Sequence, residues 1–235
     1  MFEYTSRIRY DEVGCEGVAS PSALANYLQN AAIFHAGEVG YDIYRMLEMR
    51  RGWFLLSWHI RFGRSVRWNE EIRIRTWAYD FRGPFGRRNF QIFDWQGGIL
   101  VEATSLWALM DLDRLTMVEP PEDMIRAFAP EGKALFSMRR PGKIDGGQLA
   151  PSFRIQRRDL DTNGHVNNIR WMEMALPYWP SGRPLQELLA EYKHSAVCGD
   201  QVSPRLTETG EDVHVALCRE DGEPFVRIQM AGYMG

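Results

Sequence analysis

Residues 157–168, RRDLDTNGHVNN, concentrate side chains that can move protons or hold a charged oxygen. Asp161, Asn163 and His165 occupy every second position, so an extended or turning backbone can project all three to one side. A carboxylate or an imidazole can activate water near neutral pH, and an amide can orient that water or a substrate carbonyl. The stretch therefore predicts acyl transfer to water without a serine or cysteine nucleophile.

Two other interpretations of this stretch compete with the catalytic one. Asp and Asn favour turns and helix caps, so the stretch can be a purely structural turn in which Asn167 or Asn168 caps a helix. DLDTNG also matches the first six positions of an EF-hand loop, whose twelfth position should be glutamate. That position is Arg170, and the segment before the loop alternates like a strand, so we expect no calcium site.

The elements on either side determine where the polar groups lie. FRIQRR, before the stretch, alternates like a strand, and NNIRWMEMALPYW, after it, is typical of a helix. The first N–H groups of a helix have no partner within the helix and lie at the positive end of its dipole. We therefore expect the start of this helix to hold the oxyanion that forms from a carbonyl.

The first half of the chain repeats this order of elements at greater length. Residues 21–37 have apolar side chains at helical spacing, with Ser20 as a cap and Pro21 at the first position. Residues 53–110 form short alternating runs, which predict an antiparallel meander of about four strands. Residues 119–148 are rich in Pro, Gly and charge and predict a connector with room for one short helix.

The shared order of elements predicts an internal repeat. One alignment places Asp11 on Asp159, and a second places Ser65 on Ser195. Under the first alignment the polar set exists only in the second copy, which favours a role beyond turn formation. In that alignment Asp161, Asn163 and His165 face Val13, Cys15 and Gly17.

Composition excludes several classes of function. The 235 residues carry a net charge of −3, so nothing in the overall balance requires a nucleic acid or an anionic membrane. No run of residues is long and apolar enough to predict a membrane span, and no apolar leader is visible. Three cysteines at unrelated spacings favour a reducing compartment, and we expect a cytoplasmic protein. Neither a metal nor a cofactor is expected.

Basic groups are the features expected to meet an acidic partner, with solvated surface as the alternative. They are Arg87 with Arg88, Arg139 and Arg140 with Lys143, and Arg157 with Arg158.

The segment DLDTNGHVNNIRWMEMALPYW resembles the signature of the acyl-[acyl-carrier-protein] thioesterases, Asp-Leu-Asp-x-Asn-x-His-Val-Asn-Asn followed by a helix. The resemblance extends to IRYDEVGCEGVASPSALANYLQNAA and to the run from WFLLSWHIRF to VEPPEDM, nearly the whole chain. It implies an α+β tandem hot-dog fold, each half a long helix wrapped by an antiparallel sheet. The halves would be residues 1–118, which shape the acyl pocket, and residues 149–235, which carry catalysis, joined by the linker 119–148.

The same resemblance places the family's catalytic Asp, Asn and His on Asp161, Asn163 and His165. The family's catalytic glutamate, which follows an EY strand, falls on Ser195 in EYKHSAVCGD. Serine cannot act as a carboxylate base at neutral pH, so either the glutamate is dispensable or the activity is altered.

The resulting prediction is a thioester hydrolase that releases free fatty acids from acyl carrier protein in fatty acid biosynthesis. Two alternatives are an acyl-coenzyme A thioesterase using the same site and a weakly active acyl-binding protein. The expected partner is acyl carrier protein with its acyl thioester; acyl chain length and assembly into a homo-oligomer stay open.

Overall fold

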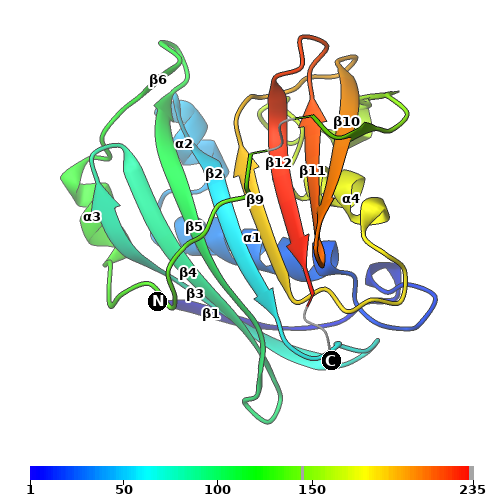
Figure 1. The fold of residues 1–235 in the computed structure, drawn as a ribbon. Coiled ribbons are helices and arrows are strands. Elements are labelled where there is room, and N and C mark those ends of the chain that lie inside the picture. The colour runs from blue at the N-terminus through cyan, green and yellow to red at the C-terminus, as the bar shows by residue number, and fades with distance from the viewer. Residues whose placement is uncertain (144–145, 233–235) are drawn as a thin grey trace. The chain divides into compact units, whose positions relative to one another are not determined.

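A computed structural model describes residues 1–143 and 146–232, and the chain divides into two compact units (Figure 1). Unit 1 comprises Met1–Leu56 and Ile60–Met138, and unit 2 comprises Ser57–His59 and Arg139–Gly235. Each unit places helix against antiparallel sheet, so the α+β tandem hot-dog fold predicted from the sequence is confirmed.

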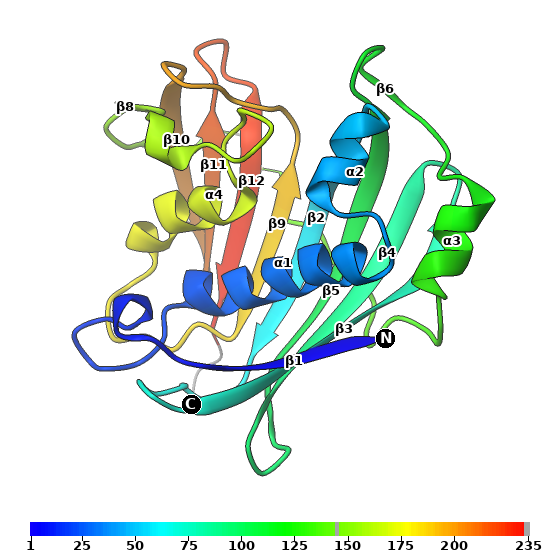
Figure 2. The ribbon, with the colours of Figure 1, turned by 180° about the vertical axis from the view of Figure 1, so that it is seen from behind.

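Unit 1 is a long helix packed on a strongly curved sheet (Figure 2). Its strands lie in the order β1-β3-β4-β5-β2, with β6 paired to β5. The four strands predicted between residues 53 and 110 are present as β2 to β5, but only β3, β4 and β5 pair in chain order as a meander; the expectation is wrong for β2, which lies beside β5 and not beside β3. The elements are β1 (Phe2–Arg7), η1 (Tyr10–Glu12), α1 (Pro21–Glu38), α2 (Ile43–Glu48), β2 (Arg51–Phe62), β3 (Glu71–Arg82), β4 (Phe85–Asp94), β5 (Ile99–Asp111), β6 (Thr116–Met117) and α3 (Glu122–Phe128).

Unit 2 has a smaller sheet in the order β9-β12-β11-β10-β7, with β8 paired to β10. Helix α4 packs against β11 and β12. The elements are β7 (Gln148–Leu149), β8 (Phe153–Arg154), η2 (Arg157–Asp159), α4 (Asn168–Ala175), η3 (Leu176–Tyr178), β9 (Glu187–Tyr192), β10 (Gln201–Thr209), β11 (Asp212–Cys218) and β12 (Pro224–Ala231).

The two helices begin for the same physical reason. The Ser20 hydroxyl accepts a hydrogen bond from the Ala23 N–H (3.1 Å) at the start of α1, as its sequence predicts. At the start of α4 the Asn167 side chain accepts from the Ile169 N–H (2.9 Å). Helix α1 runs for 18 residues. Helix α4 runs for eight and is followed by the 3-10 turn η3, which contains Pro177.

Recurring hydrogen bonds align the two copies residue by residue. In unit 1 the Gly14 N–H donates to the Val18 carbonyl (3.0 Å), and in unit 2 the Asp161 N–H donates to the His165 carbonyl (2.7 Å). His165 therefore corresponds to Val18, whereas the alignment on Asp11 pairs it with Gly17. That alignment is wrong by one residue, but the carboxylate and the imidazole of unit 2 still have no counterpart in unit 1.

The error arises in the turns η1 and η2, each of which ends in an acidic residue that binds the amide at the start of the turn. Glu12 Oε2 accepts from the Arg9 N–H (2.8 Å), and Asp159 Oδ2 accepts from the Gln156 N–H (2.8 Å). Asp159 thus matches Glu12, a residue with one more methylene, and not the identical residue Asp11.

The second alignment agrees with the structure. The Ala19 N–H donates to the Val66 carbonyl (2.8 Å), and the Val166 N–H donates to the Ala196 carbonyl (3.0 Å). Val66 and Ala196 are therefore equivalent, and Ser195 corresponds to Ser65 as expected.

The predicted connector contains the short helix α3 and is fastened by buried polar side chains. In unit 1 the Asn89 side chain donates to the Lys133 carbonyl (2.8 Å) and accepts from the Leu135 N–H (3.3 Å). In unit 2 the His59 Nδ1 accepts from the Arg139 N–H (3.1 Å), so its Nε2 carries the hydrogen that Glu187 accepts (2.6 Å). The predicted domain boundaries themselves stay a prediction.

Candidate active site

Three of the four site residues predicted from the sequence lie on one tight turn of unit 2. The Asp161 Oδ1 accepts from the Asn163 N–H (2.8 Å) and from the His165 N–H (3.3 Å). The Asp161 N–H donates to the His165 carbonyl, and the Gly164 N–H donates to the Asp161 carbonyl (3.1 Å). Gly164 has a φ of +75°, which a residue with a side chain adopts only with strain, so this turn favours glycine at that position.

The turn presents its three side chains differently. Asp161 and His165 are half-buried and Asn163 is exposed. Because one oxygen of Asp161 is bound to two amides of its own turn, the carboxylate shapes the backbone that carries His165. The simple i, i+2, i+4 projection expected from sequence therefore describes the spacing but not the role of Asp161 in holding the turn.

Ser195, the fourth predicted residue, lies on a neighbouring segment. The Val166 N–H donates to the Ala196 carbonyl, which brings the segment after β9 beside the residue that follows His165. Ser195 is exposed, and the structure gives no hydrogen bond between its hydroxyl and the turn. The backbone of Ser195 therefore lies on a segment beside the turn, but its side chain is not hydrogen-bonded to the turn.

The start of helix α4 is held from both sides. The Asn167 N–H donates to the Asp159 carbonyl (2.9 Å), and the Asn167 side chain takes the Ile169 N–H. The Tyr192 hydroxyl donates to the Asn168 carbonyl (3.1 Å). Sequence reasoning did not select Tyr192; the signal that could have found it is the second alignment, which pairs Tyr192 with Phe62.

The basic groups expected to meet an acidic partner separate into three kinds. Arg88 is only 8% exposed, so its expected surface role is wrong; its guanidinium donates to His35 Nδ1 (2.9 Å) and to the Thr76 hydroxyl (3.1 Å). Burial lowers the pKa of Arg88 to about 9. The Arg139 guanidinium donates to the Glu187 carboxylate (2.8 Å) and is committed to the fold.

Arg157 and Arg158 behave differently, because they are exposed on η2, four and three residues before Asp161. Among the residues that the structure describes, neither makes an ion pair. They are the basic side chains nearest in sequence to the turn that are available to a partner.

The cysteines are not organised as a nucleophilic site. Cys15 and Cys198 are exposed and Cys218 is buried, and all three are free thiols. Burial raises the pKa of the Cys218 thiol, which disfavours the reactive thiolate.

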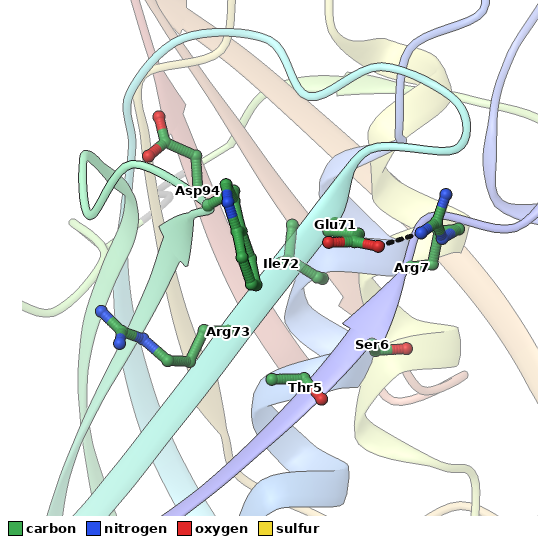
Figure 3. A pocket seen from close by; sticks show the side chains of 8 residues that line it. Thr5, Ser6, Arg7, Glu71, Ile72, Arg73 and Asp94 are labelled. Atoms are coloured by element: carbon green, nitrogen blue, oxygen red, sulfur yellow. Dashed lines mark hydrogen bonds and ion pairs between the residues drawn. The ribbon is translucent and has the colours of Figure 1, made fainter.

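A pocket on the surface of unit 1 lies elsewhere (Figure 3). It is formed by β1 and β3 residues together with Asp94 and Trp95, and the Arg7–Glu71 ion pair crosses it. None of the four predicted site residues lines it, and its other charged groups, Arg73 and Asp94, pair with Glu3 (3.8 Å) and Arg64 (3.0 Å) outside the pocket.

Residues 1–143 and 146–232 contain neither a cluster of metal-binding side chains nor a membrane-spanning helix. In these ranges no three His, Cys, Asp or Glu side chains are grouped to hold a metal ion. No helix in the same ranges combines the length and the apolar character needed to cross a bilayer.

Comparison with known families gives two matches that together span most of the chain. The model of the acyl-ACP thioesterase N-terminal domain matches residues 1–128, and that of the acyl-ACP thioesterase C-terminal domain matches residues 144–224. The predicted turn and Ser195 both fall in the second match.

Individual relatives agree with these matches. The chain is 26% identical over 232 residues to oleoyl-acyl carrier protein thioesterase 1, chloroplastic, of Arabidopsis thaliana, an alignment that covers 87% of this chain and 63% of the relative. It is 27% identical over 244 residues to dodecanoyl-[acyl-carrier-protein] hydrolase, chloroplastic, of Cinnamomum camphora, covering 94% of this chain and 63% of the relative. The chain therefore spans less than two thirds of the length of either relative.

A solved structure shares the fold. The crystal structure of an acyl-ACP thioesterase from Bacteroides thetaiotaomicron VPI-5482, 23% identical, superposes with a TM-score of 0.90 over 99% of this chain and 97% of that chain.

Proposed function

The chain belongs to the acyl-ACP thioesterase family, and on that premise we propose that it hydrolyses the acyl thioester of acyl carrier protein and releases a free fatty acid. The observation that carries the proposal is the turn of Asp161, Asn163 and His165 at the start of α4. Unit 1 closes the corresponding turn through its backbone, with Gly14 and Val18 in place of the carboxylate and the imidazole, so in unit 2 the Asp161 carboxylate adds two hydrogen bonds that stabilise the turn further.

The proposed reaction proceeds by direct attack of water. His165 takes a proton as the water oxygen bonds to the acyl carbon, and Asn163 orients the water or the carbonyl. N–H groups at the start of α4 other than those of Asn167 and Ile169, which donate within the protein, stabilise the oxyanion of the tetrahedral intermediate. The carbon–sulfur bond then breaks, and the departing sulfur receives a proton, which leaves a free acid and a thiol.

Ser195 bears on rate and not on reaction class in this proposal. A hydroxyl does not accept a proton from water at neutral pH, so we assign the base to the turn itself. His165 is the residue of the turn whose side chain type takes up and releases protons near neutral pH.

We propose acyl carrier protein as the partner because Arg157 and Arg158 are exposed beside the turn and lack ion pairs in the described chain. Cations at this position would attract an acidic carrier and the phosphate of its prosthetic arm. Arg157→Ala with Arg158→Ala is expected to raise KM for acyl-ACP about tenfold with kcat little changed. Salt should raise the wild-type KM and not that of the variant.

We propose a division of labour in which residues 1–118 set acyl chain length, residues 149–235 perform catalysis and residues 119–148 connect them. The buried group of Met46, Ala78, Leu109, Met124 and Phe128 supplies apolar volume in unit 1. Changing such volume by one methylene alters selectivity roughly tenfold or more. Leu109→Phe should therefore shift the preferred chain length, and an unchanged product profile across such variants would reject this division.

We also propose a reducing compartment such as the cytoplasm, because all three cysteines are free thiols.

The direct test is a panel of acyl-ACP and acyl-coenzyme A thioesters of varied length, with release of free thiol measured for each. Turnover on acyl-ACP with higher kcat/KM than on the matching coenzyme A thioester supports the proposal. Preference for coenzyme A supports the alternative thioesterase, and binding without turnover supports an acyl-binding protein.

A further inference from the structure

Besides the His165 N–H bond to Asp161 Oδ1, the hydrogen bonds that tie the segment from His165 to Asn168 to the rest of unit 2 include the following four. Three involve backbone groups only: Asp161 N–H to the His165 carbonyl, Val166 N–H to the Ala196 carbonyl, and Asn167 N–H to the Asp159 carbonyl. The fourth comes from a side chain, the Tyr192 hydroxyl, which donates to the Asn168 carbonyl (3.1 Å).

Unit 1 contains the three backbone bonds and lacks the fourth. The Gly14 N–H donates to the Val18 carbonyl, the Ala19 N–H to the Val66 carbonyl and the Ser20 N–H to the Glu12 carbonyl (3.0 Å). The residue equivalent to Tyr192 is Phe62; both are the last residues of their strands, β2 and β9. A phenylalanine ring has no donor.

This difference separates folding from function. Unit 1 forms its turn and an 18-residue helix with a phenylalanine at this position, so the fold does not require the hydroxyl. In unit 2 the hydroxyl is desolvated, and burial raises the pKa of Tyr192, which keeps the group protonated and able to donate. The additional donor occurs in the copy that has the carboxylate and the imidazole.

The hydroxyl acts on the first peptide group of α4. The Asn168 carbonyl and the Ile169 N–H belong to the same rigid peptide plane. Tyr192 holds the carbonyl end, and the Asn167 side chain holds the N–H end (2.9 Å). Both orientation and position of the helix start are thereby fixed, three residues after His165.

We propose that Tyr192 is a positioning residue, which fixes the start of α4 so that its amides and His165 keep the geometry needed for hydrolysis. This inference rests on the proposed thioesterase function for its effect on rate. Tyr192 does not contact the reacting atoms in this account; it acts through the Asn168 carbonyl.

Tyr192→Phe tests the inference because it removes one oxygen and recreates the residue present in unit 1. Tyr178→Phe is the matched control, since Tyr178 is a partly buried tyrosine of unit 2 for which the structure gives no hydroxyl hydrogen bond. Three quantities are measured for each variant: kcat and KM on acyl-ACP, Tm, and amide hydrogen exchange across residues 166–171.

For Tyr192→Phe we expect a kcat about tenfold lower, KM within about twofold of wild type, and exchange across 166–171 about fivefold faster. Misplacement of reacting groups by about 1 Å costs up to roughly a hundredfold, so a partial loss of order is expected to cost less. Tyr178→Phe should leave all three quantities unchanged.

Two outcomes overturn the inference. In the first, Tyr192→Phe lowers Tm while kcat and hydrogen exchange at 166–171 stay at wild-type values. In the second, Tyr192→Phe changes none of the measured quantities. If wild-type protein hydrolyses no thioester, the proposed function fails. In that case the positioning claim is still decided by the exchange comparison, which needs no activity.

Discussion

Asp161 offers a prediction in which two roles of one side chain separate. Its Oδ1 accepts from the backbone amides of Asn163 (2.8 Å) and His165 (3.3 Å), so the carboxylate both stabilises the turn and places a negative charge on the turn that carries the imidazole. Asp161→Ala removes both roles. Asp161→Asn keeps an oxygen that can accept the two amides and removes the charge.

The cost of losing the turn can be estimated from these bonds. Hydrogen bonds to a charged group contribute about 1.5–3 kcal/mol each, but Asp161 is half-exposed and its second bond is long, so we take about 1 kcal/mol each. About 2 kcal/mol corresponds to a roughly thirtyfold smaller ratio of closed to open turn, at about 1.4 kcal/mol per factor of ten. Because Asp161→Ala also removes the charge, we expect the two effects together to lower kcat by about 10² or more.

Asp161→Asn should restore most of the roughly thirtyfold loss in kcat that comes from the turn. It should restore none of the loss that comes from the missing charge. The assay is thiol release from acyl-ACP, with circular dichroism to confirm folding. Asp221→Ala is the control, because Asp221 Oδ1 accepts from the Glu223 N–H (3.1 Å) in a similar turn remote in sequence from the site, and its loss should leave kcat unchanged. The reasoning is refuted if Asp161→Asn is no more active than Asp161→Ala, or if Asp161→Ala stays within threefold of wild type.

Three further predictions concern the remaining titratable and nucleophilic groups. Ser195→Ala should change kcat less than threefold, and Ser195→Glu should raise it if the site still depends on a glutamate; a Ser195→Ala variant as inactive as His165→Ala would make the hydroxyl a participant. Replacing all three cysteines by alanine should preserve most activity, and a loss above about a hundredfold in folded protein would indicate a covalent nucleophile. Burial and the nearby Arg88 lower the pKa of His35 to about 3, whereas an unfolded histidine titrates near its ordinary value of 6.5. The unfolded chain therefore binds this proton first as pH falls, and stability should drop between about pH 6.5 and 3 by up to roughly 1.4 kcal/mol per pH unit. Urea unfolding should show a shallower pH dependence for His35→Gln and no such change for the exposed His194→Gln; equal slopes in all three proteins would contradict the assignment.

The sequence predicted what local patterns encode. The cap at Ser20 and the apolar spacing after it predicted helix α1, and the alternating runs predicted strands β2 to β5. The polar turn before α4 was also found, because Asp, Asn and Gly at fixed spacing have few other uses.

What the sequence did not reveal depends on tertiary contacts. Arg87 and Arg88 are adjacent in sequence, and only the burial of strand β4 shows that Arg88 is enclosed while Arg87 pairs with Asp80 (2.9 Å). Because identity pairs it with Asp11, Asp159 shifts the alignment of the repeat by one residue. Its structural equivalent, Glu12, performs the same hydrogen bonding with a longer side chain.

The measurement that tests the central claim most directly is the rate of fatty acid release from acyl-ACP by wild-type protein and by His165→Ala, each mixed in excess over substrate. A single turnover isolates chemistry from product release. His194→Ala controls for the general loss of a histidine in unit 2. We expect wild type and His194→Ala to release the acid at the same rate and His165→Ala to be at least about a hundredfold slower, the scale of a positioned general base. Equal rates for wild type and His165→Ala, or a folded wild-type protein that releases no acid from any acyl-ACP, would contradict the account.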